Sequence, residues 1–384
     1  MRVLMISLDS SLLGDPHGNT IQRHLEYAQR IGDLVIVTYC PAANRQTPRH
    51  FSEHLHVYPA NARPIGFPWI AYRTAARLHR AAPADLVTTQ DPFATGIVGL
   101  LLKWRFGLPL DMQNHSSFFN NHDWIAERPL RNRLLHSLGR LAVRSADTHR
   151  VLTEGEKKHY LAMGIPGERV TVLSTPTHVD LFAPPVAPEK LAAMRASLGI
   201  APGVPVILWV GQPAAVKNVE LLLAAFEQVR AQRPDTCLLM VGNFSGRPDF
   251  VQRAQAEGVI FAGRVDHANL AGYYQMAEVY THSSRYEGFG KVLVEALAAG
   301  TPVVTTRNDG SSEIVRHDET GLLTDHTPEA ISEGILALLN DPARRRAMGD
   351  AGQRDVLARF DYVRQLDAVA ATFRRTYEIT HPKG

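Results

Sequence analysis

Short apolar runs alternate with amphipathic stretches along almost the whole chain. A short continuous apolar run is typical of a strand covered on both faces, and the stretches between the runs repeat apolar residues at helical spacing. In the first such unit, the helix predicted at 20–30 places Ile21, Leu25 and Ala28 on one face. The order strand, loop, helix, strand is a βαβ unit, which predicts a parallel, doubly wound α/β sheet.

The first half of the chain repeats this unit several times. Strands are predicted at 2–8, 34–39, 54–58, 85–89, 109–113, 149–153 and 169–173. Helices are predicted at 20–30, 68–81, 93–105, 129–144 and 154–163. The stretch 183–189 contains three prolines and therefore predicts a linker.

The second half begins the same pattern again. Strands are predicted at 206–210, 237–241, 259–261 and 279–281, with a further buried strand after Pro302. Helices are predicted at 219–230, 291–299, 328–339, 341–358 and 361–377. We therefore expect two α/β domains, residues 1–183 and 184–360, with the last helix, within 361–384, packing back on the first domain.

The composition is that of a globular protein. Of 384 residues, 45% are hydrophobic and 21% are charged, and the net charge of +3 is too small to argue for a nucleic-acid partner. The two cysteines, Cys40 and Cys237, lie far apart and form neither a metal motif nor a disulfide framework, so a cytoplasmic location is expected. The N-terminus does not resemble a signal peptide, and no apolar run is long enough to span a membrane.

Two glutamates, Glu287 and Glu295, bracket the start of the helix predicted at 291–299. Eight helical positions span at most roughly 12 Å, which is about the length of a nucleotide sugar from its hexose to its ribose. The helix N-terminus between them favours a diphosphate, because its free N–H groups and positive dipole end attract anions. One carboxylate would then hold sugar hydroxyls and the other ribose hydroxyls. The alternative is that both are ordinary surface acids.

Other groups in the second half also follow predicted strands or precede predicted helices. They are Gly211 with Lys217, Gly263 with Arg264, and the loop 308–312 with Ser311 and Ser312. Glycine lets a ligand approach the backbone closely, and the lysine supplies a positive charge. None of these groups is specific alone, but together they predict a site for a phosphate-bearing ligand.

The first half offers two sets of candidate residues. The loop 9–19 contains Gly14, Asp15, Pro16, His17 and Gly18. It lacks the complete G-x-G-x-x-G pattern, which disfavours a dinucleotide-dependent dehydrogenase. Asp91 and His115 each follow a predicted strand, at the sheet edge where α/β proteins bind ligands. The alternative for His115 is a loop histidine with a local hydrogen bond.

The helix predicted at 129–144 combines a leucine stripe with arginines. The arginines are Arg131, Arg133, Arg140 and Arg144, and the leucines are Leu134, Leu135, Leu138 and Leu141. A leucine stripe that faces the core beside a solvated arginine face is the expected arrangement. The alternative is peripheral contact with anionic lipid at the inner membrane surface.

A motif in the second half resembles the signature of glycosyltransferase family 4. The motif is Ser284-Arg285-Tyr286-Glu287-Gly288-Phe289-Gly290, followed by Glu295-Ala296, Gly300-Thr301-Pro302-Val303-Val304 and Gly321-Leu322-Leu323. The resemblance covers most of the chain and implies a retaining, nucleotide-sugar-dependent enzyme. It also implies the GT-B fold, in which two Rossmann-like doubly wound domains face each other across a cleft.

The resemblance implies a role for most of the candidate residues. The catalytic residues would be Glu287 at the sugar, Lys217 at the diphosphate leaving group, and His115 over the sugar. The donor site would also include Gly211, Gln212, Arg264, Phe289, Gly290, Lys291, Glu295, Ser311 and Ser312, with the base near Arg264 and the ribose at Glu295. The acceptor side would include Gly14, Asp15, His17, Gly18 and Asp91.

The chain departs from the family pattern at several positions. Gln212 stands where the family usually has an arginine, so another arginine such as Arg285 would help to balance the diphosphate charge. Pro176-Thr177-His178 replaces the usual Pro-Asn-Gly, and Gly14-Asp15-Pro16-His17-Gly18 replaces a common glycine pair.

The expected reaction moves a hexose from a UDP- or GDP-sugar to a glycan or lipid-linked acceptor, in the synthesis of cell-surface polysaccharide or glycoconjugate. No Asp-x-Asp occurs in the chain, so neither a metal nor another cofactor is expected. The alternatives are an inactive nucleotide-sugar-binding partner of a polysaccharide assembly complex and a nucleotide-sugar epimerase; a sugar phosphorylase is disfavoured.

Overall fold

The structure is a computed structural model that describes residues 1–381, and it divides the chain into two compact α/β units. Unit 1 comprises residues 1–176 and the C-terminal segment from Val363, and unit 2 comprises Thr177–Tyr362. The boundary therefore lies seven residues before the one expected at 183/184, because the prolines of 183–189 lie inside unit 2. The last three residues of the predicted segment 361–384 lie outside the described residues.

Unit 1 contains an eight-stranded sheet in the order β3-β4-β2-β1-β5-β6-β7-β8. Its strands are β1 (Arg2–Ser7), β2 (Asp33–Pro41), β3 (Arg49–His50), β4 (Leu55–Ala62), β5 (Leu86–Thr89), β6 (Leu110–Gln113), β7 (Thr148–Val151) and β8 (Val170–Val172). Its helices are α1 (Asn19–Ile31), α2 (Phe67–Ala81), α3 (Ala94–Phe106), α4 (His122–Glu127), α5 (Pro129–Ser145), α6 (Glu154–Ala162) and α15 (Tyr362–Thr380). All pairings are parallel except that of β3 with β4.

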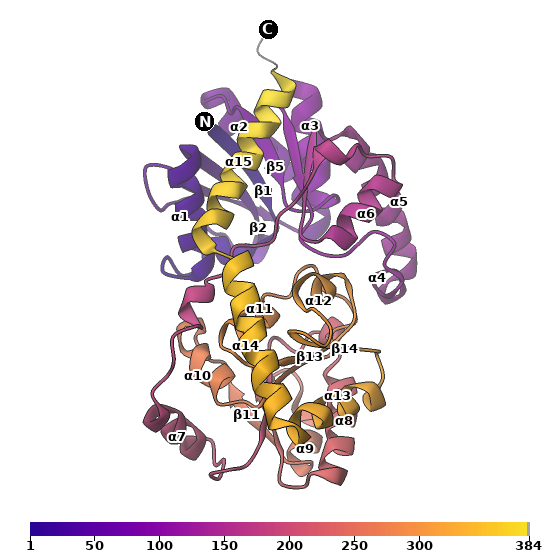
Figure 1. Cartoon of the computed structure of the whole chain (residues 1–384). Helices are drawn as coiled ribbons and strands as arrows, with labels where there is room; N and C mark the ends of the chain where they lie inside the picture. Colours follow the sequence, from indigo (N-terminus) through magenta and orange to yellow (C-terminus); the bar gives the residue numbers. More distant parts are fainter. Residues whose placement is uncertain (382–384) are drawn as a thin grey trace. The chain divides into compact units, whose positions relative to one another are not determined.

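The C-terminal helix α15 belongs to unit 1 (Figure 1). Thr376 Oγ1 lies 2.7 Å from Thr148 Oγ1 on β7, and Asp367 accepts a 2.7 Å hydrogen bond from Arg30 on α1. Buried Phe373 and Val369 add apolar contact area. These contacts fix a helix from the far end of the chain to the first sheet.

Unit 2 contains a six-stranded, fully parallel sheet in the order β11-β10-β9-β12-β13-β14. Its strands are β9 (Val206–Val210), β10 (Cys237–Val241), β11 (Val259–Gly263), β12 (Val279–His282), β13 (Val303–Thr306) and β14 (Gly321–Thr324). Its helices are α7 (Pro188–Ser197), α8 (Val219–Gln232), α9 (Pro248–Ala256), α10 (Leu270–Gln275), α11 (Lys291–Ala298), α12 (Asp309–Ile314), α13 (Pro328–Asn340) and α14 (Pro342–Arg359).

The sheet order of unit 2 decides where its candidate site lies. The strands β9, β12 and β13 are adjacent, and their residues are almost completely buried. The segments that follow these strands carry Lys217, Glu287 and Asn308. Because the carboxyl ends of parallel strands meet at one edge of the sheet, the three segments are brought together there.

Some predicted elements differ from the observed ones. The predicted linker at 183–189 runs into a helix, α7, because Pro188 occupies a first-turn position, where proline needs no backbone hydrogen bond. The short helices α4 and α9 were not predicted, whereas α12 is the helix expected at the loop 308–312. The strand β4 continues four residues beyond the predicted strand end at Tyr58.

Candidate functional site

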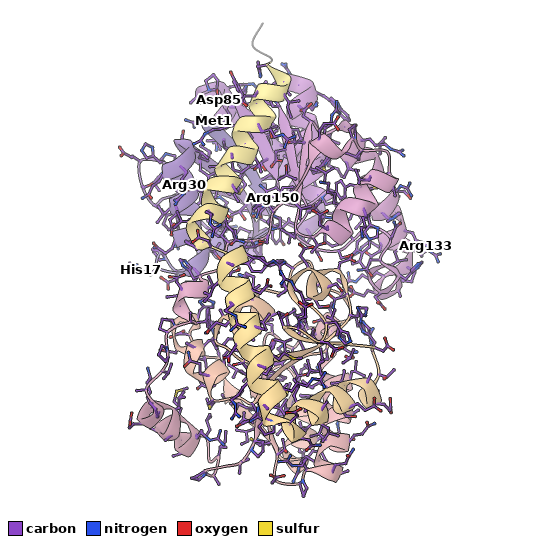
Figure 2. All side chains as sticks on the ribbon, in the orientation of Figure 1. Met1, His17, Arg30, Asp85, Arg133 and Arg150 are labelled. Atoms are coloured by element: carbon purple, nitrogen blue, oxygen red, sulfur yellow. The ribbon has the colours of Figure 1, made fainter. Side chains whose placement is uncertain are left out.

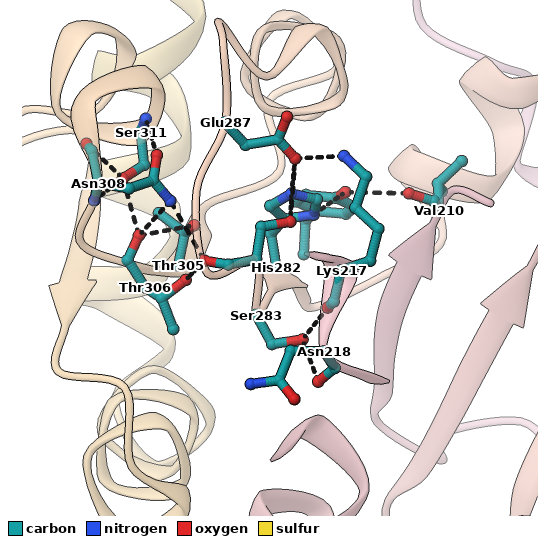
Figure 3. Close-up of polar contacts among 12 residues, drawn as sticks. Val210, Lys217, Asn218, His282, Ser283, Glu287, Thr305, Thr306, Asn308 and Ser311 are labelled. Atoms are coloured by element: carbon teal, nitrogen blue, oxygen red, sulfur yellow. Dashed lines mark hydrogen bonds and ion pairs between the residues drawn. The ribbon is translucent and has the colours of Figure 1, made fainter. Parts of the chain in front are cut away.

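Glu287 lies at the centre of a hydrogen-bonded cluster in unit 2 (Figure 3). His282 Nε2 lies 2.7 Å from Glu287 Oε1, and Ser284 Oγ donates to the same oxygen at 2.9 Å. The ammonium of Lys217 also bonds to Oε1. All three donors therefore use one carboxylate oxygen, and no hydrogen bond within the described chain uses Oε2 of Glu287. That second oxygen is available to accept from a ligand hydroxyl.

Three neighbouring strands supply this cluster. His282 is the last residue of β12, and Lys217 ends the short 3₁₀ helix Ala215–Lys217 that follows β9. The loop after β12 is held from β13, because Thr306 Oγ1 donates to the Ser284 carbonyl at 2.7 Å. Gly310 in α12 faces this loop so closely that a Cβ there would lie 2.7 Å from the Glu287 Cβ. The position of Glu287 is thus set by backbone packing on both sides.

The cluster keeps Glu287 ionised. Burial acts to raise the pKa of the Glu287 carboxyl, but the hydrogen bond from His282 and the charge of Lys217 outweigh it, and the pKa falls to about 2. Burial lowers the pKa of His282 from its ordinary value, so its imidazole is neutral at neutral pH. The neutral imidazole that carries its proton on Nε2 donates this proton in a hydrogen bond to Glu287 Oε1. Its unprotonated Nδ1 lies 3.4 Å from the Tyr280 hydroxyl.

Glu295 lies in a second polar cluster of unit 2. Its side chain is buried in α11, where His267 Nε2 lies 3.0 Å from Oε1 and the Tyr274 hydroxyl donates to Oε2 at 2.9 Å. The alternative of an ordinary surface acid is therefore wrong for Glu295. Both of its oxygens are occupied, in contrast to Glu287, so a ribose hydroxyl would replace the partly exposed His267. Ribose binding by Glu295 stays a prediction.

The N-terminus of α11 lies between the two glutamates in sequence. No side chain caps it, and Gly290 adopts a left-handed conformation at φ 92°, which favours glycine. Phe289 is buried against Phe360, with ring centroids 5.5 Å apart, whereas Lys291 is exposed. An uncapped helix N-terminus beside a lysine suits a diphosphate.

The expected phosphate contacts from the Ser311 side chain are wrong. Its hydroxyl donates to the Thr306 carbonyl at 2.7 Å and accepts from the Asn308 amide at 2.9 Å, which forms one half of a capping box. The hydroxyl is fully buried and serves the fold of α12. Ser312 in the same turn is exposed.

Gly211 and Arg264 lie at the ends of β9 and β11. The Gly211 carbonyl approaches Gly242 so closely that a Cβ on Gly242 would lie 2.0 Å from its oxygen. Arg264 is exposed and lines a cavity of about 380 Å³ together with Asn243, Phe244 and Phe261. This cavity has room for the base that the backbone near Arg264 is predicted to receive. Gln212 is exposed.

The candidate residues of unit 1 fall into two places. His115 and Asp91 line one cavity, where His115 Nε2 lies 2.9 Å from Gln113 Oε1. The Asp91 carboxylate accepts from the Phe93 amide at 2.7 Å and from the Thr95 hydroxyl at 2.7 Å, so it holds the start of α3. The loop with Gly14, Asp15, His17 and Gly18 is largely exposed and is not among the residues that line this cavity.

The expected burial of the leucine stripe on α5 is wrong. Leu134 is 61% exposed, Leu138 44% and Leu141 64%, and only Leu135 is half-buried. The helix instead packs through small residues, Gly139, Ala142 and Val143. Arg131, Arg133 and Arg144 are exposed beside the stripe, and Figure 2 shows Arg133 at the outer edge of unit 1.

Family models match both units. The model of glycosyl transferases group 1 matches residues 192–355, and that of a glycosyl transferase 4-like domain matches residues 22–176. D-inositol 3-phosphate glycosyltransferase 2 from Catenulispora acidiphila is 30% identical over 325 residues, which cover 80% of this chain and 74% of that protein. The chain belongs to glycosyltransferase family 4, group 1.

The chain spans only part of the length of other relatives, whereas it matches two solved structures over almost their whole length. The chain is 31% identical to D-inositol 3-phosphate glycosyltransferase from Jonesia denitrificans over 235 residues, which cover 58% of this chain and 55% of that protein. Sucrose-phosphate synthase from Thermosynechococcus elongatus has a TM-score of 0.81 at 24% identity, covering 98% of this chain and 99% of that one. Anabaena HepE in complex with UDP-glucose gives 0.76 at 19%, covering 98% and 100%. The GT-B fold class is thereby confirmed.

Three residues of the candidate site were not predicted from the sequence motifs, namely His282, His267 and Tyr274. His282 ends an apolar strand five positions before Glu287, and a histidine there also fits a core position. His267 and Tyr274 come from the segment before β12. Their contacts to Glu295 depend on how residues 267–275 pack against α11, which no local spacing reveals.

The low pKa of Glu287 predicts a stability difference in acid. A carboxyl with a lowered folded pKa stabilises the fold above its ordinary pKa of 4.5 and loses this contribution as the pH falls through about 2. Between pH 4.5 and pH 2 the wild type should therefore lose more unfolding free energy than Glu287→Gln, by a few kcal/mol. Urea unfolding of both proteins at several pH values in this window checks the difference. If the unfolding free energy of both proteins changed equally with pH, the ionisation of Glu287 would not stabilise the fold.

Proposed function

We propose that this protein transfers a hexose from a nucleoside-diphosphate sugar to an acceptor hydroxyl, with retention of anomeric configuration. The observation that carries the proposal is the arrangement at Glu287. One oxygen of its carboxylate is held by three donors, including Lys217, while the other is available for a ligand. An uncapped helix N-terminus follows at Gly290. The ammonium of Lys217 and the backbone amides at the helix start suit a diphosphate, and the available carboxylate oxygen of Glu287 suits the hydroxyls of the attached sugar.

The proposed reaction breaks the bond between the anomeric carbon and the diphosphate oxygen, and the leaving group takes the bonding electrons. The acceptor oxygen forms the new bond to the anomeric carbon and gives its proton to the leaving diphosphate. Charge develops on the leaving diphosphate, where Lys217 and the amides at the start of α11 stabilise it. Glu287 Oε2 orients the sugar hydroxyls, and assistance by His115 stays a prediction.

The similarities favour, in part, particular substrates. HepE was solved with UDP-glucose, and the protein from J. denitrificans is named for inositol 3-phosphate. A UDP-sugar donor is therefore the first to test, with a GDP-sugar as the alternative. A glycan or lipid-linked acceptor in cell-surface synthesis stays a proposal.

Loss of Lys217 or of Glu287 should reduce transfer strongly. Removing one group that stabilises transition-state charge costs about 10²–10³-fold in turnover, so Lys217→Ala and Glu287→Ala should lose activity on this scale. Release of nucleoside diphosphate from a set of UDP- and GDP-sugars measures it, with Lys158→Ala and Glu227→Ala, at exposed positions of α6 and α8, as the matched controls. Full turnover in both variants would contradict the proposal. Donor binding without any turnover in the wild type would instead favour an inactive nucleotide-sugar-binding partner.

We also propose that transfer needs no metal, because the chain lacks Asp-x-Asp and Lys217 supplies a positive charge for the diphosphate. Turnover should therefore be the same after dialysis against EDTA as before it, within about twofold. Diphosphate release measured with EDTA, and again with added Mg²⁺ or Mn²⁺, checks this. A loss of activity in EDTA that a divalent cation restores would show that a metal takes part.

The exposed leucine stripe of α5 supports a proposal of contact with an anionic membrane surface. Leu134 and Leu141 offer apolar area, and the exposed arginines beside them carry the charge that complements anionic headgroups. Within the described residues, no helix has both the length and the apolar character needed to cross a membrane. The proposed contact is accordingly peripheral.

Leu134→Asp/Leu141→Asp should weaken sedimentation with phosphatidylglycerol vesicles by at least about tenfold, because burying each leucine contributes about 1.5–3 kcal/mol. Leu357→Asp, at an exposed leucine of α14, is the matched control and should sediment like the wild type. If the wild type and the double variant sediment alike, α5 is not the docking surface.

A further inference from the structure

Unit 1 contains a cavity of about 270 Å³ at the carboxyl ends of its central strands. Gln113 and Arg150 come from β6 and β7, Arg23 and Tyr27 from α1, and Phe373 from α15. His115 also lines this cavity. Figure 2 shows Arg150 in the interior of unit 1. The cavity therefore combines a candidate catalytic histidine with two arginines from different elements.

Arg150 is a buried cation without a carboxylate partner. Its side chain is only 2% exposed, and it donates to the carbonyls of Leu173 at 3.0 Å and Ser174 at 2.6 Å. A third N–H donates to Gln113 Oε1 at 3.1 Å. These acceptors are all neutral, and none of the ion pairs in the described chain includes Arg150. Burial acts to lower the pKa of its guanidinium, whereas Tyr27 and the buried carboxyl of Asp111 on β6 act to raise it and offset part of the cost of this charge.

Arg23 adds a second positive charge to the same cavity. It is half-buried, and no hydrogen bond or ion pair between described residues includes its side chain. Its charge acts on both Arg150 and His24, because it contributes to the lowered pKa of each. The two arginines repel each other, and neither forms an ion pair with a carboxylate of the described residues, although the charge of buried Asp111 acts on Arg150. The remaining excess of positive charge at the cavity leaves a demand for an anion.

The carboxylates that line the cavity do not meet this demand. Asp91 accepts from the Phe93 amide and the Thr95 hydroxyl, as described above. Asp9 accepts from the Ser11 amide at 2.9 Å, at the start of the 3₁₀ helix Ser10–Leu13. Each aspartate therefore accepts hydrogen bonds from the first residues of a helix, and neither forms an ion pair with an arginine of the described chain.

We propose that this cavity holds a negatively charged oxygen group of the acceptor, a phosphate or a carboxylate, between Arg23 and Arg150. The proposal rests on the proposed transfer activity and specifies its acceptor class. Arg150 Nη1 donates to Gln113 Oε1, and His115 Nε2 lies 2.9 Å from the same oxygen. An anion bound at Arg150 would therefore lie near the candidate catalytic histidine. A guanidinium pair binds such groups through charge-assisted, bidentate hydrogen bonds.

Direct binding tests the site without any turnover. Calorimetric titration of the full chain with inorganic phosphate and with acetate should show saturable binding of at least one of them. Arg23→Gln should weaken it by about tenfold or more, since a hydrogen bond to a charged group contributes about 1.5–3 kcal/mol. Arg77→Gln, at an exposed arginine of α2, should bind like the wild type. Arg23 is the first choice because Arg150 also holds two backbone carbonyls, and its loss alone would unsettle the fold.

Matched acceptor pairs then test the role in transfer. With an active donor, the wild type should prefer an inositol phosphate over inositol, or glucuronic acid over glucose, and Arg23→Gln should reduce this preference about tenfold. The two pairs distinguish phosphate from carboxylate. Equal use of charged and neutral acceptors by the wild type would overturn the anion site. The site would also be overturned if Lys217→Ala abolished anion binding while Arg23→Gln bound the anion like the wild type. Absence of donor cleavage in a protein that still binds the anion at Arg23 would overturn the proposed function instead.

Discussion

The fixed carboxylate of Glu287 is the feature on which the proposed donor site depends. A buried acid is costly unless its charge is compensated, and His282, Ser284 and Lys217 compensate it through one oxygen. The geometry therefore stabilises the ionised form while it leaves the second oxygen for a ligand. A free lysine and a free glutamate in a solvated loop would offer neither the orientation nor the low pKa.

The parallel sheet of unit 2 makes this arrangement possible. The strands β9, β12 and β13 are neighbours although they are far apart in sequence, so their following segments converge at one edge. Gly310 lets α12 pack against the Glu287 loop, and the capping box of Asn308 and Ser311 fixes the start of α12. Residues that looked like ligand contacts, above all Ser311, thus act through the backbone that they hold.

The sequence pattern predicted the two α/β units, most strands and the placement of Glu287 and Lys217 at the same edge of one sheet, because apolar runs and strand-end glycines are local signals. It did not predict that the two side chains bond to each other. It did not predict that His282 supports Glu287, because a histidine that ends a buried strand is equally consistent with a core residue. It placed the leucines of α5 in the core, since helical spacing shows that leucines share a face but not what covers that face. The domain boundary was misplaced because prolines mark both linkers and helix starts, and Pro188 begins α7.

In the function that we propose, unit 2 binds the donor and unit 1 binds the acceptor. In unit 2 Lys217 is paired with Glu287 beside the start of α11, and in unit 1 Arg23 and Arg150 line one cavity and form no ion pair among the described residues. Equilibrium titration of the full chain with UDP, comparing the wild type with Lys217→Ala, tests the central claim about the Glu287 cluster most directly. The account predicts at least about tenfold weaker binding in the variant, because Lys217 supplies a charge-assisted contact to the diphosphate. Equal affinity of the two proteins for UDP would contradict it.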